Sequence, residues 1–198
     1  MESLERSSPV RTGYQVQDFT AEVSVEEYLR DCVNVAEFLE CCKACPNYQM
    51  VWSCPPYDFN PEDYWRQYRR LFLFGRKIIF SEEMTSKTYT PENLQELTDT
   101  ILKFEKQDMS TALFAMERQY KGSVSLCAGY CQRCSRGHCT RSEGKPCLHS
   151  DQMRYSIESL GGNVGLTITR YLHQELLWMT EGKLPEYFIL VSGLLKKE

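Results

Sequence analysis

Residues 123–147 read SVSLCAGYCQRCSRGHCTRSEGKPC, a short apolar run that includes Cys127, followed by a loop with four more cysteines. The run from Ser123 to Ala128 is suited to a β-strand, and the loop that follows contains several glycine and arginine residues. In open α/β sheets, ligands gather where loops leave the carboxyl ends of the strands. The strand pattern and the cysteines therefore predict a ligand site at the same place.

Strand-like and helix-like segments alternate on both sides of this stretch. Strands are predicted at 14–23, 77–80, 123–128 and 187–194, and helices at 25–31, from 34 onward, at 60–70, 90–120, 150–161 and 164–180. Ser24 with Glu27 forms a capping box, and Asn60-Pro61 is typical of a helix start. The alternation favours βαβ units. The predicted fold is an α/β domain with a small, mostly parallel sheet flanked by helices and with two cysteine-rich loops.

Length and composition indicate one globular domain. The chain has 198 residues, 42% of them hydrophobic, and a net charge of −4. We expect a polar, flexible tail at 1–12 and a single metal-binding domain at 13–198. No apolar run is long enough to span a bilayer, and the first 25 residues contain no apolar signal core. The prediction is a cytoplasmic protein without a membrane partner, and the mild acidity argues against a nucleic-acid binder.

Ten cysteines against three histidines are the main chemical feature of the chain. Without a secretory signal they are not expected to form disulfides, because a reducing compartment keeps thiols free. Nine of the ten lie in two stretches, 41–54 and 127–147, whereas cysteines used as core residues would be scattered. This clustering predicts metal ligands.

The second stretch offers four thiolates within 17 residues: Cys131, Cys134, Cys139 and Cys147. Cys131 and Cys134 form one C-x2-C pair, and Pro146 precedes Cys147. Zinc sites usually combine two such pairs across a longer spacer, whereas iron–sulfur clusters gather cysteines from one irregular loop beside a proline. The pattern favours a [4Fe–4S] cluster, with zinc as the alternative.

The first stretch, ECCKACPNYQMVWSCPPY at 40–57, supplies fewer ligands. Cys45 and Cys54 are each followed by proline, and either Cys42 or Cys41 completes a set of three with them. The fourth ligand is the other vicinal cysteine or Cys127, or it is absent and leaves an open iron. Cys127 is equally well explained as a strand residue. One or two clusters per chain are therefore predicted.

Several motifs resemble those of an uncharacterised prokaryotic family described as predicted metal-binding proteins. They are CPNY at 45–48, WSCPP at 52–56, AG-x-C-x2-C at 128–134, KPC at 145–147 and R-x-S-x-E-x2-G at 154–161. The resemblance spans roughly 40 to 165. It places Cys45, Cys54, Cys131, Cys134, Cys139, Cys147 and one of Cys41 and Cys42 on family cysteines. Four residues separate Cys134 from Cys139, where the family pattern is expected to have two. The resemblance implies metal binding and no particular reaction.

Three functions follow from these features. The first is an iron–sulfur protein acting in electron transfer with a ferredoxin or flavodoxin-like carrier. The second is a redox enzyme or metal-handling protein with an open iron on three cysteines. Arg154 and Glu158, at positions i and i+4 of a predicted helix, either orient a ligand of that iron or form a plain ion pair. The third is a zinc-stabilised binding module. Positive side chains near the second stretch either raise a cluster potential and steer an acidic partner or simply stabilise thiolates: Arg133, Arg136, Arg141 and Lys145.

Overall fold

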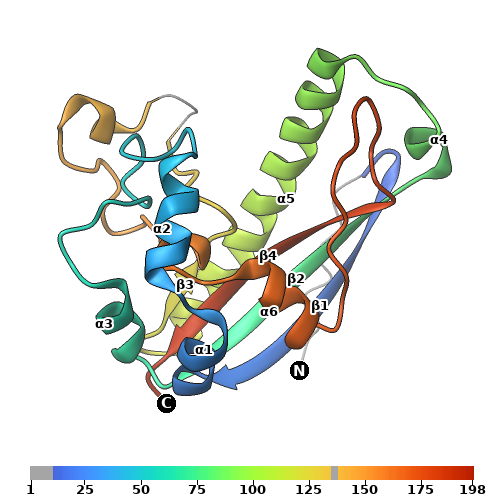
Figure 1. The fold of residues 1–198 in the computed structure, drawn as a ribbon. Helices are drawn as coiled ribbons and strands as arrows, with labels where there is room; N and C mark the ends of the chain where they lie inside the picture. Colours follow the sequence, from blue (N-terminus) through green and yellow to red (C-terminus); the bar gives the residue numbers. More distant parts are fainter. Residues whose placement is uncertain (1–10, 135–137) are drawn as a thin grey trace.

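The structure, a computed structural model, describes residues 11–134 and 138–198 (Figure 1). Most of the expected tail, residues 1–10, lies outside the described residues, and so does Arg136. Among the described residues, no helix has both the length and the apolar character needed to cross a membrane.

A four-stranded sheet in the order β1-β2-β4-β3 forms the centre of the domain. Its strands are β1 (Tyr14–Ser24), β2 (Arg70–Phe80), β3 (Val124–Leu126) and β4 (Tyr187–Lys196). β1 pairs with β2, β2 with β4 and β3 with β4, and each of these pairings is antiparallel. The prediction of a mostly parallel sheet is therefore wrong.

The connections between strands explain this difference. Ser24, at the end of β1, lies opposite Arg70, at the start of β2, so the helices between them leave and re-enter the sheet at the same end. β2 and β3 do run in the same direction, because both are antiparallel to β4. The helix α5 (Pro91–Gln119) links these two strands, but β4 lies between them. The chain alternates strands and helices as predicted, but β1 pairs antiparallel with β2, and β4 inserts between β2 and β3, the two strands that run in the same direction.

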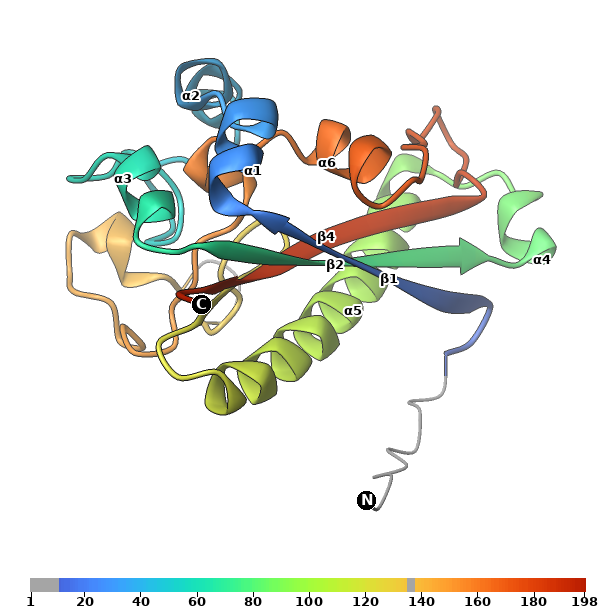
Figure 2. The ribbon, with the colours of Figure 1, turned by 90° about the horizontal axis from the view of Figure 1, so that it is seen from below.

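Helices cover both faces of this sheet (Figure 2). On one face, α1 (Val25–Cys32) and α6 (Val164–Arg170) pack over Leu71 and Leu73 of β2. On the other face, α5 packs over Ile78 and Phe80 of the same strand. An antiparallel strand with one wet face would alternate between apolar and polar residues, whereas a strand covered on both faces has a nearly continuous apolar run, as parallel strands do. This double coverage explains the nearly continuous apolar run of β2, whereas the wrong prediction of parallel strands rests on the order of the elements.

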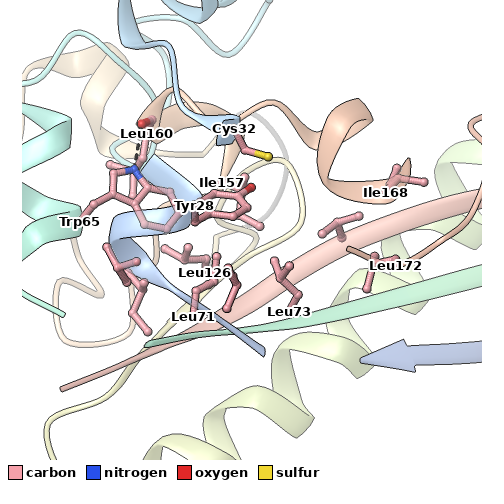
Figure 3. Close-up of a cluster of buried hydrophobic side chains, with 14 residues drawn as sticks. Tyr28, Cys32, Trp65, Leu71, Leu73, Leu126, Ile157, Leu160, Ile168 and Leu172 are labelled. Carbon is pink, nitrogen blue, oxygen red and sulfur yellow. Dashed lines mark hydrogen bonds between the residues drawn. The ribbon is translucent and has the colours of Figure 1, made fainter. Parts of the chain in front are cut away.

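The core beneath α1 also includes the short helix α3 (Pro61–Arg66) (Figure 3). Trp65 is completely buried there, and its indole N–H donates to the carbonyl oxygen of Leu160 at 3.0 Å. The Tyr28 hydroxyl bonds with that of Thr167 at 2.6 Å. Cys32, on the same helix as Tyr28, is a buried thiol, 3% exposed.

The remaining elements are α2 (Val35–Lys43), α4 (Glu82–Thr85) and two 3-10 helices, η1 (Thr140–Glu143) and η2 (Glu158–Leu160). The helix predicted at 150–161 is wrong, because only η2 forms within it. Here the Ser156 and Ser159 hydroxyls each accept a hydrogen bond from the other residue's backbone N–H. Such side-chain bonds compete with helix formation.

A buried carboxylate attaches α5 to the sheet. Glu105 of α5 is fully buried and accepts hydrogen bonds from Arg11 at 2.6 Å, Tyr14 at 2.9 Å and Arg76 at 2.9 Å. Arg76 also bonds Asp18 at 2.7 Å. The network joins β1, β2 and α5, and so fixes the helix across the sheet.

We expect Glu105→Gln to lower the free energy of unfolding by about 2–3 kcal/mol, because two buried guanidinium groups lose their shared charged acceptor. Urea denaturation followed by circular dichroism measures this change. The matched control is Glu83→Gln in the exposed pair with Lys87, which should leave the midpoint unchanged. Equal midpoints for the two variants would contradict this assignment.

Candidate metal centre

The first cysteine loop follows α2. The Asn34 side chain caps this helix, accepting from the Glu37 N–H at 3.2 Å and donating to the Glu37 carboxylate at 2.9 Å. The last turn of α2 contains Cys41 and Cys42. The chain then folds back through successive turns. In these turns the Cys45 N–H donates to the Cys42 carbonyl oxygen and the Cys54 N–H donates to the Val51 carbonyl oxygen, both at 3.0 Å.

Three of the predicted ligands come together in this loop. The pKa of the Cys54 thiol is raised to about 12, mainly by burial and also by the neighbouring Cys45 and Cys42 thiols, while a hydrogen bond with Ser53 opposes the shift. Cys54 is 7% exposed, Cys42 is half-buried and Cys45 is exposed. Cys41, the neighbour of Cys42 in the chain, is also exposed. The structure therefore groups Cys42 with Cys45 and Cys54.

The second loop leaves the sheet at the end of β3, as predicted. Its four candidate ligands, Cys131, Cys134, Cys139 and Cys147, line one cavity of about 60 Å³. Burial raises the pKa of Cys134, and the next causes are the other three thiols of this set. The two histidines next to these ligands differ in position, because His149 also lines the cavity while His138 is exposed.

The ten cysteines are all free thiols. Burial and neighbouring thiols raise the pKa of a thiol, so it stays protonated. A bound metal cation lowers that pKa, because it stabilises the thiolate form. Among the described residues, no three His, Cys, Asp or Glu side chains are placed to bind a single metal ion. A cluster cage keeps its ligand sulfurs farther apart than one ion does, because the cage itself lies between them. A soft, thiol-rich set around a cavity fits an iron–sulfur group chemically.

Arg141 joins the two cysteine loops, which lie side by side (Figure 1). Arg141 lies in η1, in the second loop. Its guanidinium donates to three carbonyl oxygens of the first loop: that of Val51 at 2.9 Å, that of Pro56 at 2.5 Å, and that of Cys54. The same group lies over the Trp52 ring, 5.3 Å from its centroid. We call this set of contacts the Arg141 clamp.

Two further bonds run between the loops. The Cys131 N–H donates to the Ser53 hydroxyl at 2.9 Å, and the Trp52 indole N–H donates to the Lys145 carbonyl at 3.2 Å. Trp52 and Ser53 also line the cavity of the second loop. The first loop therefore supplies part of the wall of the second site, and the two loops form one unit.

Cys127 and Glu158 lie between the two groups of cysteines. The Cys127 thiol donates to the Arg154 carbonyl at 3.2 Å, and burial raises its pKa well above the ordinary value. The thiols of Cys131 and Cys54 and the Glu158 carboxyl all raise this pKa further, so both loops are close. The structure thus places Cys127 at the junction of the two loops.

The proposed pairing of Arg154 with Glu158 is wrong, because no helix aligns them. Arg154 instead forms a 2.7 Å ion pair with Glu117 of α5. Burial raises the pKa of Glu158, and backbone N–H groups and the Ser156 hydroxyl partly oppose this shift.

The positive side chains of the second loop have separate roles. Arg133 lies over the Phe114 ring at 4.2 Å, and Lys145 forms an exposed ion pair with Glu143 at 2.6 Å. Arg141 satisfies carbonyl oxygens in the clamp. Of these three, Arg133 is exposed beside the cavity without an ion pair among the described residues.

Sequence reasoning missed the contacts of Trp52 and Ser53, the clamp role of Arg141, and the burial of Glu158. Three of these residues stand in motifs that were recognised only for their cysteines or spacing, WSCPP at 52–56 and R-x-S-x-E at 154–158. The signal that could have indicated these roles was the presence of the non-cysteine residues within the motifs.

These observations define a class, a small α/β domain with an antiparallel sheet and two docked cysteine loops that form a candidate metal centre. The family described as predicted metal-binding protein (DUF2284) matches residues 30–195, and the chain belongs to this family. Neither a search of curated proteins nor a search of solved structures gave a match.

We predict that Arg141→Lys will loosen both loops, because an ammonium group cannot reach three carbonyl oxygens with the fixed fork of a guanidinium. Hydrogen exchange should become at least about tenfold faster in 47–57, the loss of about 1.4 kcal/mol of local stability. Lys145→Ala, which removes an exposed pair from the same loop, is the control. Unchanged exchange in 47–57 for Arg141→Lys would show that the clamp is dispensable.

Proposed function

We propose that the protein is an iron–sulfur protein of the electron-transfer type, with a [4Fe–4S] cluster held by Cys131, Cys134, Cys139 and Cys147. The observation that carries this proposal is the single cavity lined by all four cysteines. A bound [4Fe–4S] cluster takes up and releases one electron at a time.

The surroundings of the cavity support this role. Trp52 and Met153 line it with the cysteines and limit the access of water, which helps to set a cluster potential. The Ser53 hydroxyl, which accepts from the Cys131 N–H, fixes the backbone of one ligand. The Arg141 clamp keeps these walls in position through the first loop.

A second cluster is proposed on the first loop, with Cys42, Cys45 and Cys54 as ligands. The Cys45 and Cys42 thiols both raise the pKa of Cys54, and this closeness supports the second cluster. Cys41 and Cys127 remain candidates for a fourth ligand from the sequence pattern. Two clusters in one docked unit would provide a short path for an electron between the loops.

The partner we propose is a small acidic carrier of the ferredoxin or flavodoxin type in the reducing cytoplasm. Exposed Arg133 beside the second site supports docking of an acidic surface. Free thiols throughout the chain agree with a reducing compartment.

Two other functions compete with electron transfer. A redox enzyme or metal-handling protein is favoured by the first loop, where only three cysteines converge. A zinc-stabilised binding module would need accessible aromatics near the basic segment at 65–70, but Trp65 is completely buried in the core.

The deciding measurement is the metal and sulfide content of protein purified without oxygen. We expect a brown protein with equal iron and acid-labile sulfide, about eight of each per chain for two clusters or about four for one. A colourless protein with stoichiometric zinc and no sulfide would overturn the proposal in favour of the zinc module.

Single cysteine variants then separate the two sites. Cys134→Ser should remove about four irons and leave the first loop loaded, and Cys54→Ser should do the reverse, because each replaces a soft thiolate with a poor iron ligand. Cys41→Ser tests which of the two vicinal cysteines is a main ligand, and it should keep more iron than Cys42→Ser because Cys41 is exposed and Cys42 is half-buried. An equal loss for Cys41→Ser and Cys42→Ser would contradict the grouping of Cys42 with Cys45 and Cys54.

A further inference from the structure

A cavity of about 350 Å³ lies between α5 and the start of the second loop. Lys106, Ser110 and Phe114 of α5 line one wall, and because they are four residues apart they share one face of the helix. Residues within 127–133 form the opposite wall. Thr111 also lines the cavity and is exposed, so the cavity opens to solvent. Its volume is at the lower end of the range for small-molecule sites.

The lining of this cavity is cationic. Lys106, Arg133 and Arg154 line it, and none of its lining residues in the described part of the chain is Asp or Glu. This is unusual in a chain with a net charge of −4. Arg154 is neutralised by its 2.7 Å ion pair with Glu117. Lys106 and Arg133 form no ion pair within residues 11–134 and 138–198, so two uncompensated positive charges line one cavity.

Aromatic rings are the neighbours of these two cations. Lys106 Nζ lies 5.6 Å from the centroid of the Tyr130 ring, and the Arg133 guanidinium lies 4.2 Å from that of Phe114. Burial lowers the pKa of Lys106, and the Glu158 carboxyl, which lines a different cavity, opposes this shift. A ring helps to orient a cation but does not neutralise it. The counter-charge therefore has to come from a bound molecule.

We infer that this cavity binds a small organic dianion, with carboxylate or phosphate groups, between Lys106 and Arg133. The guanidinium fork of Arg133 matches the paired oxygens of either group, and Lys106 supplies a compact point charge. The Ser110 and Tyr130 hydroxyls also line the cavity, form no hydrogen bond within the described chain, and can donate to anionic oxygens. Half-buried Lys106 is recessed from a flat protein surface, which favours a small molecule over an acidic protein.

The position of this anion site gives it a possible effect on the metal centre. Tyr130, Cys131 and Arg133 line both this cavity and the cavity of the second cysteine loop. Negative charge beside a cluster lowers its reduction potential, because the reduced cluster carries more negative charge. A bound dianion would thus set how readily the second site gives up an electron. This consequence rests on the proposed function, whereas the anion site itself uses none of the proposed metal ligands.

Isothermal titration calorimetry on the full chain, purified without oxygen, tests the site with two probes. Succinate carries two carboxylates, and glycerol 3-phosphate carries one phosphate dianion. We expect at least one of them to bind, more weakly at high salt because exposed Arg133 is screened. The tighter probe identifies the anionic group. Succinamide, which resembles succinate but is uncharged, should not bind. Binding of both anions no tighter than that of succinamide would overturn the inference.

Lys106→Gln should weaken binding of the tighter probe at least about tenfold, because one of the two cations is lost. Lys103→Gln is the matched control, since Lys103 is exposed on the same helix and does not line the cavity, and it should bind like wild type. Arg133→Gln, at the exposed rim, should reproduce the loss in a variant that keeps the helix unchanged. Wild-type affinity in both Lys106→Gln and Arg133→Gln would contradict the site.

Metal content separates this inference from the proposed function. Lys106→Gln should keep the wild-type iron and sulfide, and loss of iron together with binding would instead assign Lys106 to the thiolates of the second loop. Wild-type protein that binds a probe but contains no sulfide would overturn the iron–sulfur proposal and leave the anion site in place. Full iron and sulfide in a protein that binds neither probe would overturn the anion site alone.

Discussion

One guanidinium holds the candidate site together. A loop covered by another loop must still satisfy its backbone carbonyls. Arg141 does this for Val51, Cys54 and Pro56 at once, because its donors lie in a fixed plane. Without it, fewer hydrogen bonds, such as those of Trp52 and Ser53, would join two cysteine loops that lie far apart in the sequence. The arrangement of both sets of thiols therefore depends on a residue that binds no metal itself.

The sheet supplies the rigid base for this unit. Helices on both faces bury β2 and β4, and the Glu105 network fixes α5 across them. The Arg154–Glu117 ion pair ties the end of the second loop to that same helix. Thiols placed on irregular loops can keep their positions only when the loops are tied to regular elements at several points.

Local signals predicted many of the elements but not all of their bounds, since the helix predicted at 164–180 ends at Arg170 and the strand predicted at 77–80 begins at Arg70. Tertiary pairing was beyond these signals. Ser24, Asn34 and Thr90 directly precede α1, α2 and α5 and cap them, so short sequence patterns correctly predicted where these three helices begin. The antiparallel sheet depends on β1 pairing directly with β2 and on β4 inserting between β2 and β3, and neither pairing leaves a local trace. Four clustered cysteines predicted the cavity of the second loop. The partners of Arg141 and the burial of Glu158 arise from contacts across many residues, so spacing could not reveal them.

The long reach of Arg141 has a consequence for how the protein is made. Its acceptor at Val51 lies 90 residues earlier in the chain. During translation, the first loop leaves the ribosome long before the residue that fixes its shape has been synthesised. Cys42, Cys45 and Cys54 therefore meet the cell as unshielded thiols on an unbraced loop. Their final arrangement can form only after the second loop has emerged.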